Sequence, residues 1–147
     1  MQKKVRILAA AEFETKPLAD MDLGSHCRID HVGIGAIAAA AQAARLQIDE
    51  DEDLFFLGSC GTFGDFRGPS LVTASSVRWR PTGDRAGLSY TIKGTEPPLD
   101  LSPIPGLPPV TVICGPGISL VKELDGDLKG PDAVENVELY AVAAVLK

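Results

Sequence analysis

Short apolar segments that end at glycines or other small residues recur along this chain and limit the folds open to it. Segments of this kind lie at residues 5–11, 54–57, 71–77 and 110–114, and residues 28–35, which read RIDHVGIG, predict a further strand that closes on two glycines. Uniformly apolar runs of this length bounded by glycine or proline are typical of strands buried on both faces. The alanine-rich stretch from Ala36 to about Ile48 predicts a helix, because alanine is the best helix former.

The C-terminal stretch from about Val134 to Leu146 predicts another helix. Its apolar residues recur at i, i+3 and i+4, which indicates one buried face. Glu135 and Glu138 are three residues apart, so on such a helix they would share a face. The six prolines between residues 97 and 109 instead predict an extended excursion, with a candidate short strand at 89–93 before it.

Strands that alternate with helices predict an α/β fold. In that fold, helices flank a mostly parallel or mixed central sheet in three layers. A chain of 147 residues has the size of one ordinary domain, so residues 1–147 are expected to form a single domain. In parallel sheets, ligands bind beyond the carboxyl ends of the strands. We therefore expect the turns that follow the strands to be neighbours around one cleft.

Composition excludes several classes of protein. The hydrophobic fraction is 45%, with no apolar run near the length of a membrane span, and the N-terminus lacks a signal-peptide pattern. We expect a cytoplasmic protein without a membrane partner. The formal net charge of −6 disfavours a nucleic-acid partner, which requires a basic surface. Three widely spaced cysteines predict neither a disulfide framework nor a metal cluster.

Two standard motifs are incomplete. The glycines at 33 and 35 open a helix as a dinucleotide-binding loop does, but no acidic residue ends the next strand to hold a ribose. Cys60 with His31 is a candidate nucleophile and base, although a buried structural cysteine is the commoner case. His26, Cys27 and His31 have no standard metal-ligand spacing. We therefore expect neither a cofactor nor a metal.

Carboxylates and a glycine turn remain as candidate chemistry at the strand ends. Glu12 and Glu14 follow the first strand, and the acids at 135 and 138 lie near the C-terminus. The segment 56–64 reads FLGSCGTFG, an apolar strand that breaks into glycines around small polar side chains. Glycine allows a ligand to approach the backbone closely. Carboxylates can accept hydrogen bonds from sugar hydroxyls or orient a water.

Five segments, taken in order, resemble one enzyme superfamily. They read VRILAAAEFE, HVGIGAIAAA, FLGSCGTFG, VICG and ENVELYAVA. As an ordered set they resemble the purine nucleoside phosphorylase/nucleosidase superfamily, and the futalosine hydrolases and methylthioadenosine/adenosylhomocysteine nucleosidases most of all. The resemblance implies a phosphorylase-like fold that is shortened at its C-terminus.

The resemblance also assigns candidate site residues. Glu14 falls on the acid that positions the attacking water, and Glu138 on the acid that binds ribose hydroxyls. Ser59 and Gly61 fall on the turn that lines the sugar or phosphate end. Val137 replaces a methionine that packs on the sugar, and Ile118 takes the place of an aromatic residue that stacks on the base.

Two departures from the superfamily pattern bear on activity. Phe56 stands where the phosphorylases have a phosphate-holding arginine, so water is the expected nucleophile. No residue matches the aspartate that protonates the leaving base. The first hypothesis is a nucleosidase that cleaves the N-glycosidic bond of a purine-type ribonucleoside. The alternative is a catalytically impaired domain that binds a nucleoside or a partner subunit. Self-association into a homo-oligomer is expected to cover the apolar surface of a trimmed sheet.

Overall fold

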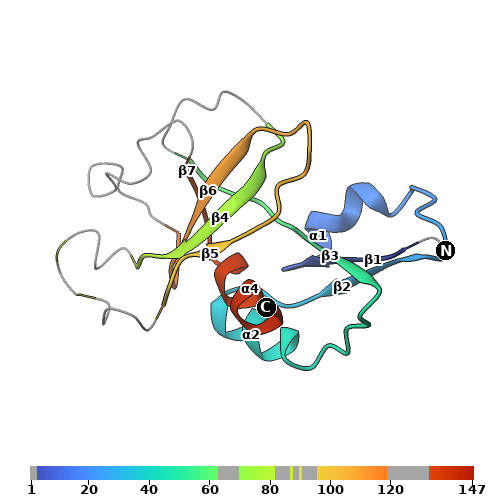
Figure 1. The fold of residues 1–147 in the computed structure, drawn as a ribbon, viewed down its shortest axis with the longest axis horizontal. Coiled ribbons are helices and arrows are strands. Elements are labelled where there is room, and N and C mark those ends of the chain that lie inside the picture. The colour runs from blue at the N-terminus through green and yellow to red at the C-terminus, as the bar shows by residue number, and fades with distance from the viewer. Residues whose placement is uncertain (1–2, 63–69, 82–86, 88–89, 91–95, 119–132) are drawn as a thin grey trace.

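The first sheet contains the N-terminal part of the chain. The computed structural model describes residues 3–62, 70–81, 87, 90, 96–118 and 133–147. Strand β1 (Lys4–Ala9) lies in the middle of this sheet, between β2 (Cys27–His31) and β3 (Glu52–Leu57), and both pairings are parallel (Figure 1). The three apolar runs predicted as strands here are therefore confirmed.

The second sheet has the order β5-β4-β6-β7. It is formed by β4 (Thr73–Trp79), β5 (Leu99–Asp100), β6 (Pro109–Cys114) and β7 (Ala133–Asn136). Within it, β4, β6 and β7 are parallel, and the two-residue β5 pairs antiparallel with β4. Most of the candidate strand at 89–93 lies outside the described residues. The predicted mostly parallel or mixed sheet is confirmed.

A backbone bridge joins the two sheets. After β3 ends, Gly61 exchanges two hydrogen bonds with Glu135 of β7, with N–O distances of 2.9 and 2.7 Å. The chain that leaves β3 therefore runs directly onto the edge of the second sheet. This bridge brings the turn at 58–62 to the carboxyl end of β7.

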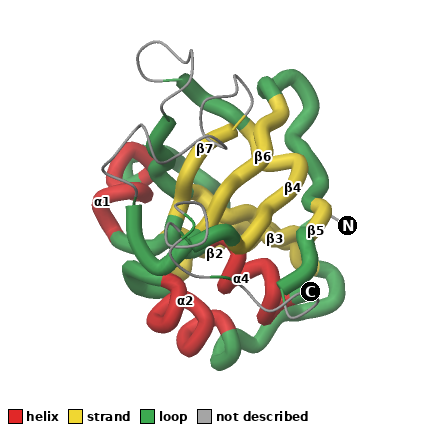
Figure 2. Tube along the Cα trace, turned by 90° about the vertical axis from the view of Figure 1, so that its left-hand side faces the viewer, coloured by secondary structure: helices red, strands yellow, loops and turns green. Residues whose placement is uncertain are grey.

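Two helices pack side by side against the sheets. These are α2 (Ala36–Ala43) and α4 (Leu139–Leu146), and Figure 2 shows the short α1 (Glu12–Thr15) well apart from them. A 3₁₀ turn, η1 (Lys16–Leu18), continues from α1. The buried apolar residues form two clusters, and helix α4 contributes to each of them. Val142 packs with Leu8 and α2 in one cluster, and Tyr140 packs with Val77 and the second sheet in the other. None of the helices in the described part of the chain has the length and apolarity that crossing a bilayer requires.

The prediction of one helix from Val134 to Leu146 was wrong. Residues 133–136 form β7, whose register pairs Val134 with Val112 of β6, and α4 begins only at Leu139. Glu135 is therefore a strand residue and Glu138 immediately precedes the helix, so the two acids do not share a helix face. The other predicted helix is shorter than expected and ends at Ala43.

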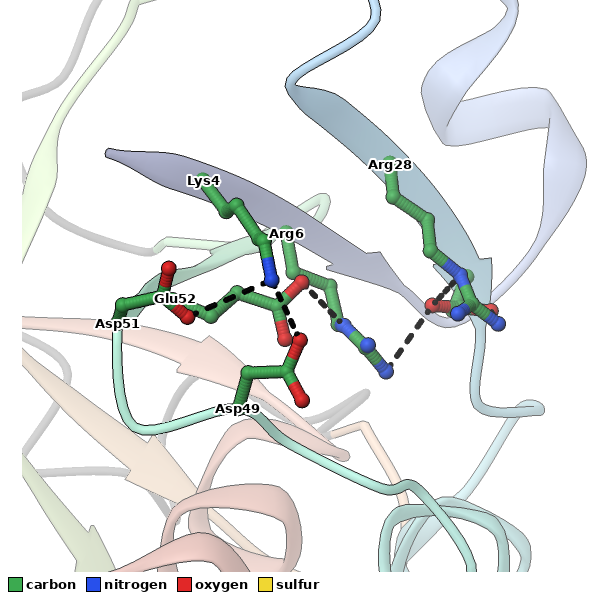
Figure 3. A network of polar contacts seen from close by, with 7 residues as sticks. Lys4, Arg6, Arg28, Asp49, Asp51 and Glu52 are labelled. Carbon is green, nitrogen blue, oxygen red and sulfur yellow. Dashed lines mark hydrogen bonds and ion pairs between the residues drawn. The ribbon is translucent and has the colours of Figure 1, made fainter. Parts of the chain in front are cut away.

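A buried cluster of charged side chains connects the three strands of the first sheet. The Arg6 side chain is 5% exposed; its Nε lies 3.0 Å from Glu52 Oε1 and its Nη1 lies 3.5 Å from Asp30 Oδ2 (Figure 3). These residues come from β1, β3 and β2 respectively, so the cluster fixes all three strands. Around its exposed rim, Lys4 bonds Asp49 at 2.8 Å.

Candidate functional site

The turns after β1 and β2 meet at the carboxyl ends of these strands. Val32 N donates to Ala9 O at 2.8 Å, and Gly33 N donates to Ala10 O at 3.0 Å. The backbone beyond β2 is thereby held against the turn that leads into α1. The expectation that the turns after the strands are neighbours is confirmed for this pair, and the contacts below extend it to β3 and β7.

Glu14 accepts hydrogen bonds from the turns after β1 and β3. Its Oε2 accepts from Ala10 N at 2.9 Å and from Ala11 N at 3.4 Å, and its Oε1 accepts from Ser59 N at 2.7 Å. Residues 12–15 form one helical turn, which folds the Glu14 side chain back onto the amides before it. A carboxylate has about four acceptor positions, so these three bonds leave one position on Oε1.

Glu138 is held in the same way by the turn after β2. Its side chain accepts a hydrogen bond from Gly35 N at 2.8 Å through Oε1, and the residue is 4% exposed. Gly35 has φ 88° and ψ 150°, a conformation that is essentially restricted to glycine. The glycine thus aims its amide at the carboxylate and at the same time starts α2.

Ser59 and Asn136 connect the two carboxylates. Asn136, the last residue of β7, donates from Nδ2 to Ser59 O at 3.0 Å, while Ser59 N bonds Glu14. Asn136 Oδ1 accepts from the amide of Glu138 at 2.9 Å. A continuous set of hydrogen bonds therefore runs from Glu14 through Ser59 and Asn136 to Glu138 and Gly35. These hydrogen bonds connect the carboxyl ends of β1, β2, β3 and β7 to one another.

The remaining predicted site residues occupy different positions around this arrangement. Gly61 forms the bridge to Glu135, and a Cβ added at Gly61 would meet no atom of the described residues within 4 Å. Val137 is half-buried between Asn136 and Glu138. Ile118 is 62% exposed in the segment after β6, the strand beside β7. No contact in the structure ties Ile118 to either carboxylate within the described residues.

The candidate pair of Cys60 and His31 does not have the environment of an activated nucleophile. His31 Nε2 lies 2.9 Å from Thr15 Oγ1. Burial raises the pKa of the Cys60 thiol, although the residue is exposed overall, whereas a catalytic cysteine requires a lowered pKa. Across the described ranges, no group of three or more histidine, cysteine, aspartate or glutamate side chains is arranged to hold a metal ion.

A cavity of about 380 Å³ lies away from the carboxylates. Its lining includes Leu8, Phe56, Thr73, Leu99, Val142 and Leu146, and neither Glu14, Ser59 nor Glu138 belongs to it. It is mostly apolar and contains no hydrogen-bonded carboxylate pair. We assign the candidate site to the strand ends, where the polar groups converge, and not to this cavity.

Solved structures with the same fold include nucleosidases. The chain superposes on a futalosine hydrolase mutant of Helicobacter pylori with a TM-score of 0.74 and 14% identity, over 99% of this chain and 84% of that one. It superposes on the Campylobacter jejuni 5'-methylthioadenosine/S-adenosyl homocysteine nucleosidase with a TM-score of 0.73 and 15% identity, over 98% and 79% of the two chains. The chain has the nucleosidase fold. No protein-family model matches the sequence. No curated protein matches it either.

A third nucleosidase was solved with a ligand. This is the 5'-methylthioadenosine/S-adenosylhomocysteine nucleosidase of Neisseria meningitidis in complex with methylthio-immucillin-A, at a TM-score of 0.72 and 16% identity, over 98% of this chain and 79% of that one. The predicted phosphorylase-like α/β fold is confirmed by these superpositions. At such identities the likeness concerns the fold.

Sequence reasoning missed Asn136 and the role of Gly35. The sequence identifies Gly35 as a glycine that opens a helix, and Asn136 lies unmarked inside the segment ENVELYAVA. A signal for Asn136 was present, because asparagine just before a helix commonly bonds the first free amides. For Gly35 the sequence carries no such signal, since its partner Glu138 lies 103 residues away.

Proposed function

We propose that the protein binds a purine-type ribonucleoside over the strand ends and hydrolyses its N-glycosidic bond with water. The observation that carries this proposal is the linked pair of carboxylates, Glu14 and Glu138, each fixed by backbone amides and joined through Ser59 and Asn136. Pre-organised carboxylates suit a reaction in which positive charge develops on a sugar.

Glu138 binds the ribose hydroxyls in this proposal. Because Oε1 is held by Gly35 N, the second oxygen has a defined direction and can accept from a hydroxyl. A hydrogen bond from a hydroxyl to a carboxylate is stronger than one between neutral groups. Val137, next along the chain, supplies an apolar surface for the sugar.

Glu14 orients the attacking water. Its one remaining acceptor position, on Oε1, lies beside the Ser59 amide, so a water bound there is held by the carboxylate. The water oxygen bonds to the anomeric carbon, the carbon–nitrogen bond breaks with its electron pair on the base, and Glu14 accepts the water proton. Ser59 and Gly61 line the sugar side, and Ile118 contacts the base.

The nature of the solved relatives supports a nucleoside ligand. The Neisseria meningitidis nucleosidase holds methylthio-immucillin-A, and a Helicobacter pylori nucleosidase is described with 5'-methylthioadenosine in its active site. We also propose that residues 1–147 form one domain and that the site lies at the ends of its strands.

One observation favours the second candidate function, a nucleoside-binding domain with impaired catalysis. Within residues 1–147, no residue corresponds to the aspartate that the superfamily resemblance expects as general acid. Loss of a general acid costs about 10²–10⁴ in rate. Binding without turnover is the result that this candidate predicts.

Incubation with methylthioadenosine, adenosylhomocysteine, futalosine and inosine tests both candidates. We expect release of free base, detected by chromatography, at a rate independent of added phosphate. Thermal stabilisation by a nucleoside without any release would establish the second candidate, and absence of both would refute the two together.

Variants of the carboxylates sharpen the assay. Glu14→Gln is expected to lower the rate of base release by about 10²-fold or more, because a neutral amide accepts a water proton poorly. Glu12→Gln is the matched control, since Glu12 lies on the same helical turn with an exposed side chain. Equal rates in the two variants would remove the water-orienting role of Glu14.

A further inference from the structure

Asn136 uses every polar group of its side chain inside the candidate site. The residue is 7% exposed and ends β7. Its Nδ2 donates to Ser59 O at 3.0 Å, and its Oδ1 accepts from the amides of Glu138 and Leu139 at 2.9 and 2.8 Å. One side chain therefore bonds the turn after β3 and the start of α4 at the same time.

The chemistry of these partners fixes the orientation of the amide. Both groups facing Oδ1 are N–H donors, and the group facing Nδ2 is a carbonyl acceptor. A flipped amide would lose all three hydrogen bonds and would oppose donor to donor and acceptor to acceptor. Asparagine combines a donor and an acceptor in a side chain of this length, whereas an ionised aspartate has no donor and the serine hydroxyl is on a shorter side chain.

The approach of the β3 turn to Asn136 is close. A Cβ added at Gly58 would lie 3.4 Å from Asn136 Nδ2 and 2.7 Å from Phe56 Cε1. The short distance is to Phe56, near the end of β3, whereas 3.4 Å from Asn136 Nδ2 is an ordinary van der Waals distance. The close approach to Asn136 is made by the Ser59 carbonyl, which lies 3.0 Å from Nδ2.

We propose that Asn136 is a positioning residue for the nucleoside site. Its side chain sets the distance between Glu138 and the Ser59 turn, and that turn bonds Glu14. The two carboxylates are thereby placed so that both can contact one ligand. The effect of Asn136 on nucleoside binding rests on the proposed function, whereas its effect on the position of the Ser59 turn can be measured without a ligand.

Two substitutions separate the two roles of the side chain. Asn136→Asp keeps an acceptor for the amides of Glu138 and Leu139 but places an oxygen against Ser59 O. Asn136→Ser also keeps a capping oxygen, adds no charge, and is too short to reach Ser59. Aspartate and serine are both good residues for capping a helix start. If one variant does not fold, the other decides.

Hydrogen exchange of single amides provides the readout. Without its tie to Asn136, the Ser59 turn should open more often, so the Ser59 amide, which bonds Glu14, is expected to exchange about tenfold faster. The Val142 amide, bonded to Glu138 O inside α4, should keep its rate. Ala144→Gly is the matched control: it weakens α4 at an exposed position and should accelerate Val142 but not Ser59.

Nucleoside affinity completes the test. If the wild-type protein binds methylthioadenosine, both Asn136 variants should raise its Kd by about tenfold, and Ala144→Gly should leave it unchanged. An unaltered Ser59 exchange rate in the Asn136 variants would overturn the inference, whatever the protein binds. Failure of the wild-type protein to bind any nucleoside, together with faster Ser59 exchange, would instead refute only the proposed function.

Discussion

Replacement of Arg6 by methionine should destabilise the protein strongly without altering the strand-end site. Arg6 and Glu52 are both nearly buried, with side chains 5% and 4% exposed, and they meet at 3.0 Å. At this separation and an effective dielectric constant of about 20, the Coulomb attraction amounts to about 5 kcal/mol before desolvation is subtracted. Methionine fills a similar volume but leaves the Glu52 carboxylate buried beside β1 without its cation.

The expected loss in the free energy of unfolding is about 3 kcal/mol, the lower end of the range for breaking a buried ion pair. The lower end applies because Arg6 Nε and Glu52 Oε2 are among the buried described atoms that have no hydrogen-bond partner, so the pair is held by charge more than by hydrogen-bond geometry. Lys3→Met is the matched control. Its pair with Asp53 is exposed, at 71% and 46%, so its loss should stay below about 1 kcal/mol.

Urea unfolding followed by fluorescence of the single tryptophan, Trp79, measures both losses. The double variant Arg6→Met/Glu52→Gln should recover part of the stability, because it removes the stranded charge as well. Nucleoside Kd should be unchanged in Arg6→Met at low urea, since Arg6 lies in the middle of β1, whereas Glu14 and Ser59 lie beyond the carboxyl ends of β1 and β3. A loss in Arg6→Met no larger than that in Lys3→Met would refute the reasoning.

Two further predictions concern glycine and cysteine residues. Gly35→Ala should lower the free energy of unfolding by about 1–3 kcal/mol, because φ is 88° at this position, and should also weaken nucleoside binding through Glu138. Gly106→Ala, at a similar φ of 87°, should lower stability alone. Equal nucleoside Kd values for the two variants by calorimetry would contradict this. Cys60 should be alkylated by iodoacetamide in the native protein, faster as pH rises toward its raised pKa and more slowly with nucleoside bound. Cys114, buried and with its pKa raised by burial to about 12, should react only after unfolding; mass spectrometry that finds native Cys114 modified would contradict this.

Local sequence was sufficient for β1, β2, β3, β4 and β6 and for the edge of the sheet that carries the site. Residues 110–114 are buried on most positions of both faces, so their apolar signal does not depend on their partners. Residues 54–57 carry the same apolar signal, although Leu54 and Phe55 are exposed in the structure. Because parallel strands place their carboxyl ends together, Glu14 and Ser59 were expected near each other. The hydrogen bond between them confirms that expectation.

The tertiary structure alone decided the secondary structure around Glu138. The spacing of apolar residues from 134 to 146 fits one helix, and it fits equally a short strand followed by a helix. Pairing of β7 with β6 and the bridge from Gly61 to Glu135 select the strand, because they supply backbone partners from elsewhere in the chain. A local pattern contains no information about those partners.

The sequence by itself determined which segments are buried and which small and acidic residues follow them. Only the tertiary structure decided which of those residues bond one another, because the contacts join residues that are 45, 77 and 103 positions apart: Glu14 with Ser59, Ser59 with Asn136, and Gly35 with Glu138. Hydrogen bonds depend on the order and register in which strands assemble, and these are set by the packing of the whole chain.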